Sequence, residues 1–142
     1  MVFKINIADK SGKTFKLESE SPELVGKELG NTILGQEISP ELAGYELEIT
    51  GASDNAGFAS LKNVEGIALK KVLLTYGKCM HKRPKGLKKK LSNKTPKGLR
   101  LRKTVRGKVI SEATVQINTK VTKESGKKLN EIFSEQNQPK TA

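Results

Sequence analysis

Alternating apolar and polar residues predict strands along most of this chain. In residues 2–9, Phe3, Ile5 and Ile7 alternate with polar positions, and residues 14–19 repeat the pattern after a short polar turn. A period of two places one row of side chains on a buried face and the next row in solvent. The two segments therefore predict an antiparallel hairpin as the first unit of the fold.

Later segments extend the same pattern. We expect further strands over residues 32–38, 45–50, 72–76, 104–110 and 115–121. Ser-Pro-Glu at 21–23 supplies an N-cap residue, a first-turn proline and a first-turn acid, and residues 39–41 repeat this signal for a short helical turn. Residues 125–134 predict a short helix whose inward residues are Leu129, Ile132 and Phe133.

These elements predict one mainly β domain of 142 residues. Residues 1–77 and 104–122 are expected to form a small closed β-barrel of six or seven strands, because open sheet edges invite aggregation. Between them, prolines and glycines replace the apolar periodicity, so residues 78–103 are predicted to be a long, basic, extended loop. Residues 123–142 complete the domain as a short helix and tail.

The positive charge of the chain is concentrated in one segment. The net charge is +12, yet residues 1–65 hold six basic and eleven acidic residues. From residue 66 to residue 111 there are sixteen Lys and Arg residues and no acid. Cations crowded in this way repel one another unless a polyanion lies against them. We therefore predict that this segment contacts nucleic acid.

The composition of the basic segment also indicates how it binds. No Phe, Tyr or Trp occurs between Gly77 and Ile132, so the predicted loop of residues 78–103 has no platform for base stacking. We expect contacts to phosphates and to the shape of folded RNA. The predicted RNA-binding residues are Lys78, Lys82, Arg83, Lys85, Lys88, Lys89, Lys90, Lys94, Lys97, Arg100, Arg102, Lys103, Arg106 and Lys108.

No catalytic or metal-binding pattern is found in the sequence. Cys79 and His81 are the sole cysteine and histidine, whereas a zinc site generally needs three or four such ligands. Ser11-Gly12-Lys13-Thr14 matches the end of a phosphate-binding loop, but the motif requires a glycine where this chain has Ile7, so these residues are predicted to be a hairpin turn. We expect no enzyme activity, no cofactor, no metal and no small-molecule substrate.

Membrane and export signals are likewise not found. The apolar runs are too short for a spanning helix, and the first residues lack the basic and apolar regions of a secretion signal. A single cysteine permits no intrachain disulfide and fits a reducing compartment. We expect a soluble cytoplasmic protein without a membrane partner.

Several motifs together resemble one known family. Residues 97–107 read Lys-Gly-Leu-Arg-Leu-Arg-Lys-Thr-Val-Arg-Gly, and Ile-Ser at 110–111 and Val-Gln-Ile-Asn at 115–118 follow. With Gly51, Ser53-Asp54, Gly57-Phe58 and the first two strands, they resemble the small-subunit ribosomal protein of the archaeal and eukaryotic type numbered six. The chain departs from that family at Ala59-Ser60, where Pro-Met is usual, and at Lys82, where an aromatic residue is usual.

The resemblance implies an archaeal-length member with a compact β-barrel and basic extensions packed against ribosomal RNA. We therefore expect a structural constituent of the small ribosomal subunit, located on the cytoplasmic ribosome, that binds and stabilises folded rRNA and supports translation. Its expected partners are small-subunit rRNA and neighbouring ribosomal proteins. A free-standing RNA-binding factor or RNA chaperone remains the alternative.

Overall fold

The computed structural model describes residues 2–82, 97–134 and 136. Within them the chain forms the strands β1 (Phe3–Ala8), β2 (Thr14–Ser19), β3 (Thr32–Leu34), β4 (Glu46–Asp54), β5 (Leu69–Thr75), β6 (Arg100–Arg106) and β7 (Thr114–Lys123). Three 3₁₀ turns, η1 (Pro22–Leu24), η2 (Gly35–Glu37) and η3 (Pro40–Leu42), and the helix α1 (Leu129–Ile132) complete the described elements.

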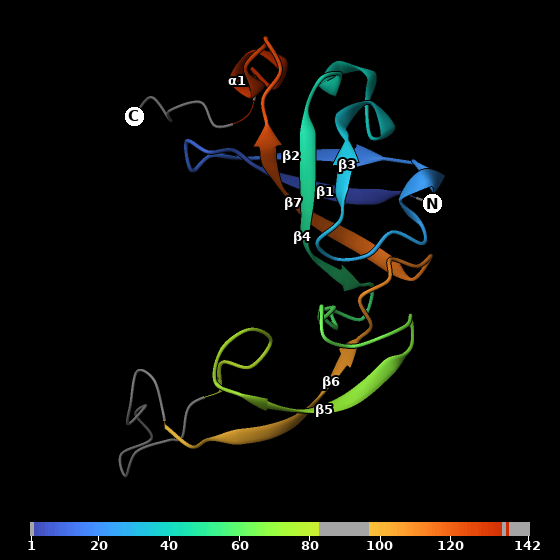
Figure 1. Ribbon diagram of the computed structural model, residues 1–142, viewed down its shortest axis with the longest axis vertical. Coiled ribbons are helices and arrows are strands. Elements are labelled where there is room, and N and C mark those ends of the chain that lie inside the picture. The colour runs from blue at the N-terminus through green and yellow to red at the C-terminus, as the bar shows by residue number, and fades with distance from the viewer. Residues whose placement is uncertain (1, 83–96, 135, 137–142) are drawn as a thin grey trace.

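Five strands form one sheet in the order β2-β1-β7-β4-β3 (Figure 1). The pairing of β1 with β7 is parallel, and the other three pairings are antiparallel. In this register Ile5 lies beside both Leu17 and Ile117, so one face of the sheet is a continuous apolar surface. A register shift at Thr50 lets both Ile49 and Ala52 stay buried on that face.

The segment between β2 and β4 contributes much of the cover of this apolar face. Leu24 of η1, Ile38 directly after η2, and Leu42 of η3 are buried against the sheet, and Leu129 of α1 closes one end. The turns η1 and η3 form where the sequence repeats Ser-Pro-Glu, and Ser39 accepts a hydrogen bond from the Glu41 amide. The core is therefore made of a sheet on one side and irregular turns on the other.

The local predictions hold where period-two alternation is clear. The hairpin of β1 and β2 runs from the pair Phe3–Ser19 to the pair Ala8–Thr14, as predicted. The strand expected over residues 32–38 ends at Leu34, because Gly35 begins η2. A Cβ at Gly35 would lie 2.1 Å from the Leu42 carbonyl oxygen, so glycine is needed for this close approach of the chain.

The predicted closed barrel is wrong. Among the described residues the main sheet is open, and β5 and β6 pair with each other instead of joining it. Its edges are protected in other ways. The edge strand β3 has only three residues. On the opposite edge, the Gln136 side chain donates to the Lys16 carbonyl oxygen and accepts from the Lys16 amide, both at 2.8 Å. Edge protection does not require closure.

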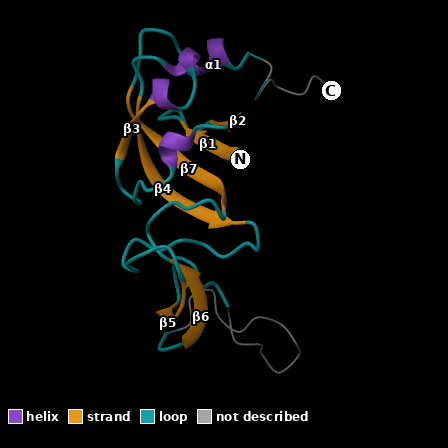
Figure 2. Ribbon diagram, turned by 90° about the vertical axis from the view of Figure 1, so that its right-hand side faces the viewer, coloured by secondary structure: helices purple, strands orange, loops and turns teal. Residues whose placement is uncertain are grey.

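Strands β5 and β6 form a two-stranded ribbon that projects from the sheet (Figures 1 and 2). Strand β6 begins at Arg100, so residues 100–103, which were predicted to end the extended loop, are part of a strand. The part of that predicted loop from 83 to 96 lies outside the described residues. Alternation in the sequence did not predict the start of β6, because a ribbon outside the core has no deeply buried face along that part of its length.

A backbone junction joins the ribbon to the sheet. After β6, the Gly107 amide donates to the Ala68 carbonyl oxygen (3.2 Å) and the Lys108 amide to the Val64 carbonyl oxygen (2.8 Å). On the other side, the Leu29 amide donates to the Lys108 carbonyl oxygen at 3.0 Å. The chain from 107 to 110 is thus held between two neighbouring segments.

We predict that Gly107→Ala destabilises the protein at this junction. An added Cβ would lie 1.8 Å from the Gly66 carbonyl oxygen and 3.2 Å from the Ile67 nitrogen, and these are backbone atoms that cannot rotate away. We expect a loss of at least about 2 kcal/mol in the free energy of unfolding, measured by chemical denaturation. Gly126→Ala is the matched control, since a Cβ added at that position would have no neighbour within 4 Å. Equal stability of the two variants would contradict the prediction.

Candidate nucleic-acid interface

The β5–β6 ribbon displays its cations without placing any two directly opposite each other. Its seven antiparallel pairs contain six basic residues, and each of these faces an uncharged residue on the other strand. Arg100 lies opposite Thr75, Arg102 opposite Leu73, and Lys103 opposite Val72. Like charges directly across a ladder are destabilising, so this register limits repulsion within the ribbon.

The structure places most of the described predicted residues on the surface. Exposed side chains are those of Lys78, Lys82, Lys97, Arg100, Arg102 and Lys103. Arg83, Lys85, Lys88, Lys89, Lys90 and Lys94 lie outside the described residues. The exposed cations are close in sequence to the β5–β6 ribbon or part of it, so the ribbon with residues 76–82 and 97–99 forms the described part of the candidate interface.

A tight turn fixes the start of the predicted loop. Gly77 and Met80 exchange two backbone hydrogen bonds of 2.8 and 3.1 Å, and the Met80 side chain is fully buried. The Tyr76 and His81 rings meet edge to face with 5.9 Å between their centroids. Lys78 Nζ donates to the Thr50 carbonyl oxygen at 3.1 Å, which links this turn to β4. The base of the basic segment is therefore anchored to the fold.

Arg106 differs from the other predicted RNA-binding residues because it forms a buried ion pair. Its Nε and Nη2 donate to Asp54 Oδ2 at 3.0 and 2.9 Å, and its Nη1 donates to the Ile67 carbonyl oxygen at 3.2 Å. The Asp54 side chain is 1% exposed, and its Oδ1 accepts the Phe58 amide at 2.7 Å. The pair joins the end of β4 to the end of β6.

Lys108 is also engaged within the chain. Its Nζ lies 2.9 Å from a Glu65 oxygen and 3.0 Å from a Glu28 oxygen. The hydrogen bonds with Glu65 and then Glu28 raise the pKa of the Lys108 ammonium above its usual value. Arg106 and Lys108 both lie in the basic segment of the sequence, but only the fold shows that each of them contacts acidic side chains.

Two cations on the ribbon were not among the predicted site residues. Lys70 and Lys71 are exposed on β5, directly opposite Val105 and Thr104 of β6. The sequence already shows that Lys70 and Lys71 are basic. Placing them in the interface requires knowing that residues 69–75 pair with residues 100–106. The candidate interface thus includes both strands of the ribbon.

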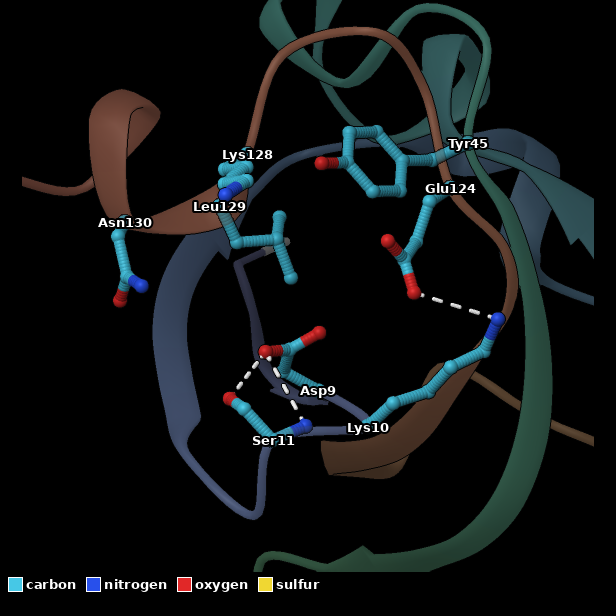
Figure 3. A pocket seen from close by; sticks show the side chains of 8 residues that line it. All are labelled: Asp9, Lys10, Ser11, Tyr45, Glu124, Lys128, Leu129 and Asn130. Atoms are coloured by element: carbon cyan, nitrogen blue, oxygen red, sulfur yellow. Dashed lines mark hydrogen bonds and ion pairs between the residues drawn. The ribbon is translucent and has the colours of Figure 1, made fainter.

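A pocket of about 260 Å³ lies at the end of the molecule away from the ribbon (Figure 3). Asp9, Ser11, Tyr45 and Glu124 contribute to its wall, and Lys10 pairs with Glu124 at 3.2 Å. The Ser11 hydroxyl donates to Asp9 and lowers the pKa of that carboxyl, whereas burial raises the pKa of the Tyr45 phenol. Ser11 lies in the hairpin turn between β1 and β2, as predicted.

Neither a metal-binding cluster nor a membrane-spanning helix is found in the part of the chain that the structure describes. In residues 2–82 and 97–134, no three His, Cys, Asp or Glu side chains come together in a group that could hold a metal ion. Among the described helices, none has the length and apolar character needed to cross a bilayer.

The exposed cations of the projecting ribbon form a basic patch of the kind that is typical of proteins that bind polyanions. The model of the family described as ribosomal protein S6e matches residues 3–134. The chain belongs to the ribosomal protein S6e family, which confirms the resemblance found in the sequence.

Three relatives illustrate the extent of this similarity, and each is named small ribosomal subunit protein eS6. The protein of Methanococcus maripaludis strain C6 is 42% identical over 122 residues, which are 85% of this chain and 87% of the relative. The Nanoarchaeum equitans protein is 40% identical over 136 residues, 94% of this chain and 91% of the relative. The Archaeoglobus fulgidus protein is 38% identical over 141 residues, 95% and 98% respectively.

We predict that Arg106→Ala destabilises the fold far more than Arg102→Ala. Removing the guanidinium leaves Asp54 as a buried charge without its ion-pair partner, which typically costs about 3 kcal/mol or more. Arg102 is exposed, so its removal should change the free energy of unfolding by less than about 0.5 kcal/mol. Chemical denaturation of both variants measures the difference. If Arg106→Ala unfolds at the same denaturant concentration as Arg102→Ala, the ion pair is not structural.

Proposed function

We propose that this chain is a structural constituent of the small ribosomal subunit and not an enzyme. Relatives that carry the name small ribosomal subunit protein eS6 match it over most of their length and its own. In this role it works in translation on the cytoplasmic ribosome, beside small-subunit rRNA and neighbouring ribosomal proteins. The chain binds and stabilises folded rRNA through its basic segment.

The observation that carries this proposal is the separation of charge between the two parts of the molecule. In the sheet, two acids of β4 pair with lysines of β7, Glu48 with Lys120 at 2.9 Å and Glu46 with Lys123 at 3.2 Å. The hydrogen bond from Lys120 lowers the pKa of the Glu48 carboxyl. The ribbon instead presents exposed cations, and no acid occurs from residue 66 to residue 111. A polyanion is the partner that such a surface fits.

The RNA-binding surface that we propose is made of two groups of residues. The first is the exposed set on and beside the ribbon, with Lys70 and Lys71 added to it. The second is the cluster between 82 and 97, which shares the uninterrupted positive charge of the segment. Arg106 and Lys108 serve the surface indirectly, because their pairs with Asp54, Glu28 and Glu65 fix the base of the ribbon.

Contacts to phosphate and to RNA shape suit this surface better than stacking on bases. The ring of Tyr76, the only Phe, Tyr or Trp in residues 66–111, already meets His81 edge-on. Lys and Arg side chains spaced along a ribbon can contact the phosphates of a folded RNA without reading its base sequence. Binding of this kind releases counterions and weakens as salt is added.

We predict that replacing Arg100, Arg102 and Lys103 by alanine weakens binding to small-subunit rRNA and lowers its salt dependence. Each lost phosphate contact removes a little under one unit from the slope of log affinity against log salt, so the triple variant should lose about two to three units. The measurement is a series of binding titrations at increasing salt. The three side chains are exposed, so the variant should stay folded.

A control with the same loss of charge separates local contact from net charge. Lys4, Lys127 and Lys128 are exposed on the sheet part of the molecule. Alanine at these three positions should leave the salt slope nearly unchanged. Equal slopes in the two triple variants would show that net charge alone, and not the ribbon, determines binding.

A second prediction separates a ribosomal constituent from a free-standing RNA-binding factor or RNA chaperone. We expect the full chain to sediment with small subunits in a sucrose gradient at high magnesium concentration, and to remain with them after a moderate salt wash. Sedimentation is followed with an antibody or tag across the fractions. If the chain stays at the top of the gradient while the subunits sediment, the ribosomal assignment fails.

A further inference from the structure

One face of the ribbon leaves apolar side chains in solvent. Among the described residues, six large apolar side chains are at least 42% exposed, and three of them lie on or beside β5. These are Ile67, Leu69 and Leu73, at 50%, 44% and 52% exposure. Exposed apolar side chains grouped in this way mark contact surfaces more often than scattered ones do.

The register shows what accompanies these residues. Direct partners in an antiparallel pair point to the same face, so Leu73 shares its face with Arg102, and Thr75 shares it with Arg100. Lys71 lies on the same face, two residues from Leu73. This face therefore has two rows: an aliphatic row, Leu69 and Leu73 along β5, with Lys71 between them, and a basic row, Arg100 and Arg102 along β6, which Thr104 separates from the ion-paired Arg106. We call it the two-row face.

The opposite face of the ribbon is different. There Val105 is buried, Val72, Leu74 and Leu101 are partly covered, and Lys70 and Lys103 are exposed. The rest of the chain thus covers the apolar side chains of one face and leaves those of the two-row face open. None of the ion pairs formed by the described residues uses Lys71, Arg100 or Arg102.

We propose that the two-row face binds the ribose-phosphate edge of double-stranded RNA along its minor groove. The basic row contacts phosphates of one strand, and the aliphatic row packs on the riboses beside them. This inference rests on the proposed function and makes it more specific, because it assigns the class of RNA and the part of the ribbon that recognises it.

The spacing and the chemistry of the two rows support this occupant. Alternate residues of a strand are about 6.6 Å apart, which is close to the distance between successive phosphates of a nucleic-acid strand. The minor groove of A-form RNA is wide and shallow and displays its riboses, so a flat ribbon can reach them. The paired residues of the two-row face include no aromatic side chain that could stack on unpaired bases.

A protein occupant fits the same face less well. It would have to bring acids in a row beside apolar residues, because every charge on the two-row face is positive. An RNA duplex of any sequence carries a regular row of phosphate charges next to its riboses. Charge complementarity therefore favours RNA over a neighbouring protein.

The test uses the full chain with Leu69 and Leu73 changed to serine. We expect on the order of a tenfold loss of affinity for a duplex segment of small-subunit rRNA, because apolar contact with riboses is removed. The salt slope should not change, since the phosphate contacts remain. Val25→Ser with Leu34→Ser is the matched control, as both residues are similarly exposed, at 42% and 46%, on the sheet part.

Comparison of nucleic acids and a crosslink complete the test. The loss should be largest for duplex RNA, and smaller for single-stranded RNA and for a DNA duplex of the same sequence. A photoreactive residue at Leu73 should crosslink to rRNA in the assembled subunit, which does not depend on the folding of the serine variant. A crosslink to protein would overturn the inference, and so would unchanged duplex binding by the serine variant.

Failure of this inference is distinguishable from failure of the proposed function. If the serine variant binds rRNA normally while the Arg100, Arg102 and Lys103 variant binds weakly, the basic segment binds RNA but the aliphatic row does not. If the unaltered chain does not bind rRNA at all, the proposed function itself is wrong.

Discussion

The ion pair between Asp54 and Arg106 is the buried side-chain contact that, beside the backbone junction at residues 107–110, joins the ribbon to the sheet. Asp54 is the last residue of β4, and Arg106 is the last residue of β6. Both Asp54 oxygens are bonded, one to the guanidinium and one to the Phe58 amide. A two-stranded ribbon is marginally stable by itself, so its geometry depends on the junction at its base. Because the carboxylate is buried, removing one partner of this pair destabilises the fold far more than breaking a surface ion pair does.

The sequence correctly predicted the elements that depend on local patterns of residues. The hairpin of β1 and β2, the 3₁₀ turns at Pro22 and Pro40, and the strands β4 and β7 follow from alternation and capping. The barrel prediction failed because closure depends on contacts distant in sequence. The side chain of Gln136 protects the edge at Lys16, 120 residues away. No periodicity along the chain reports such a contact.

The site was predictable as a segment and less so as a set of residues. The uninterrupted positive charge located the ribbon, but it did not distinguish Arg102 from Arg106 as RNA-binding residues. Both are arginines on one strand with alternating neighbours. Their environments differ because Asp54, 52 residues before Arg106, is brought to the end of β6. The same holds for Lys108 with Glu28 and Glu65. Which cations are free to bind is a property of the tertiary fold.

The division of charge also has a consequence for folding. Residues 1–65 carry more acids than bases, and several of these acids pair with lysines of the sheet or of the junction. The core can therefore form without a polyanion, since the dense positive charge lies outside it. Within the ribbon, each cation faces an uncharged residue across the ladder, so repulsion acts along the strands and between diagonal neighbours. A bound RNA would remove that remaining repulsion, and ribbon stability and RNA affinity are thus coupled through the same charges.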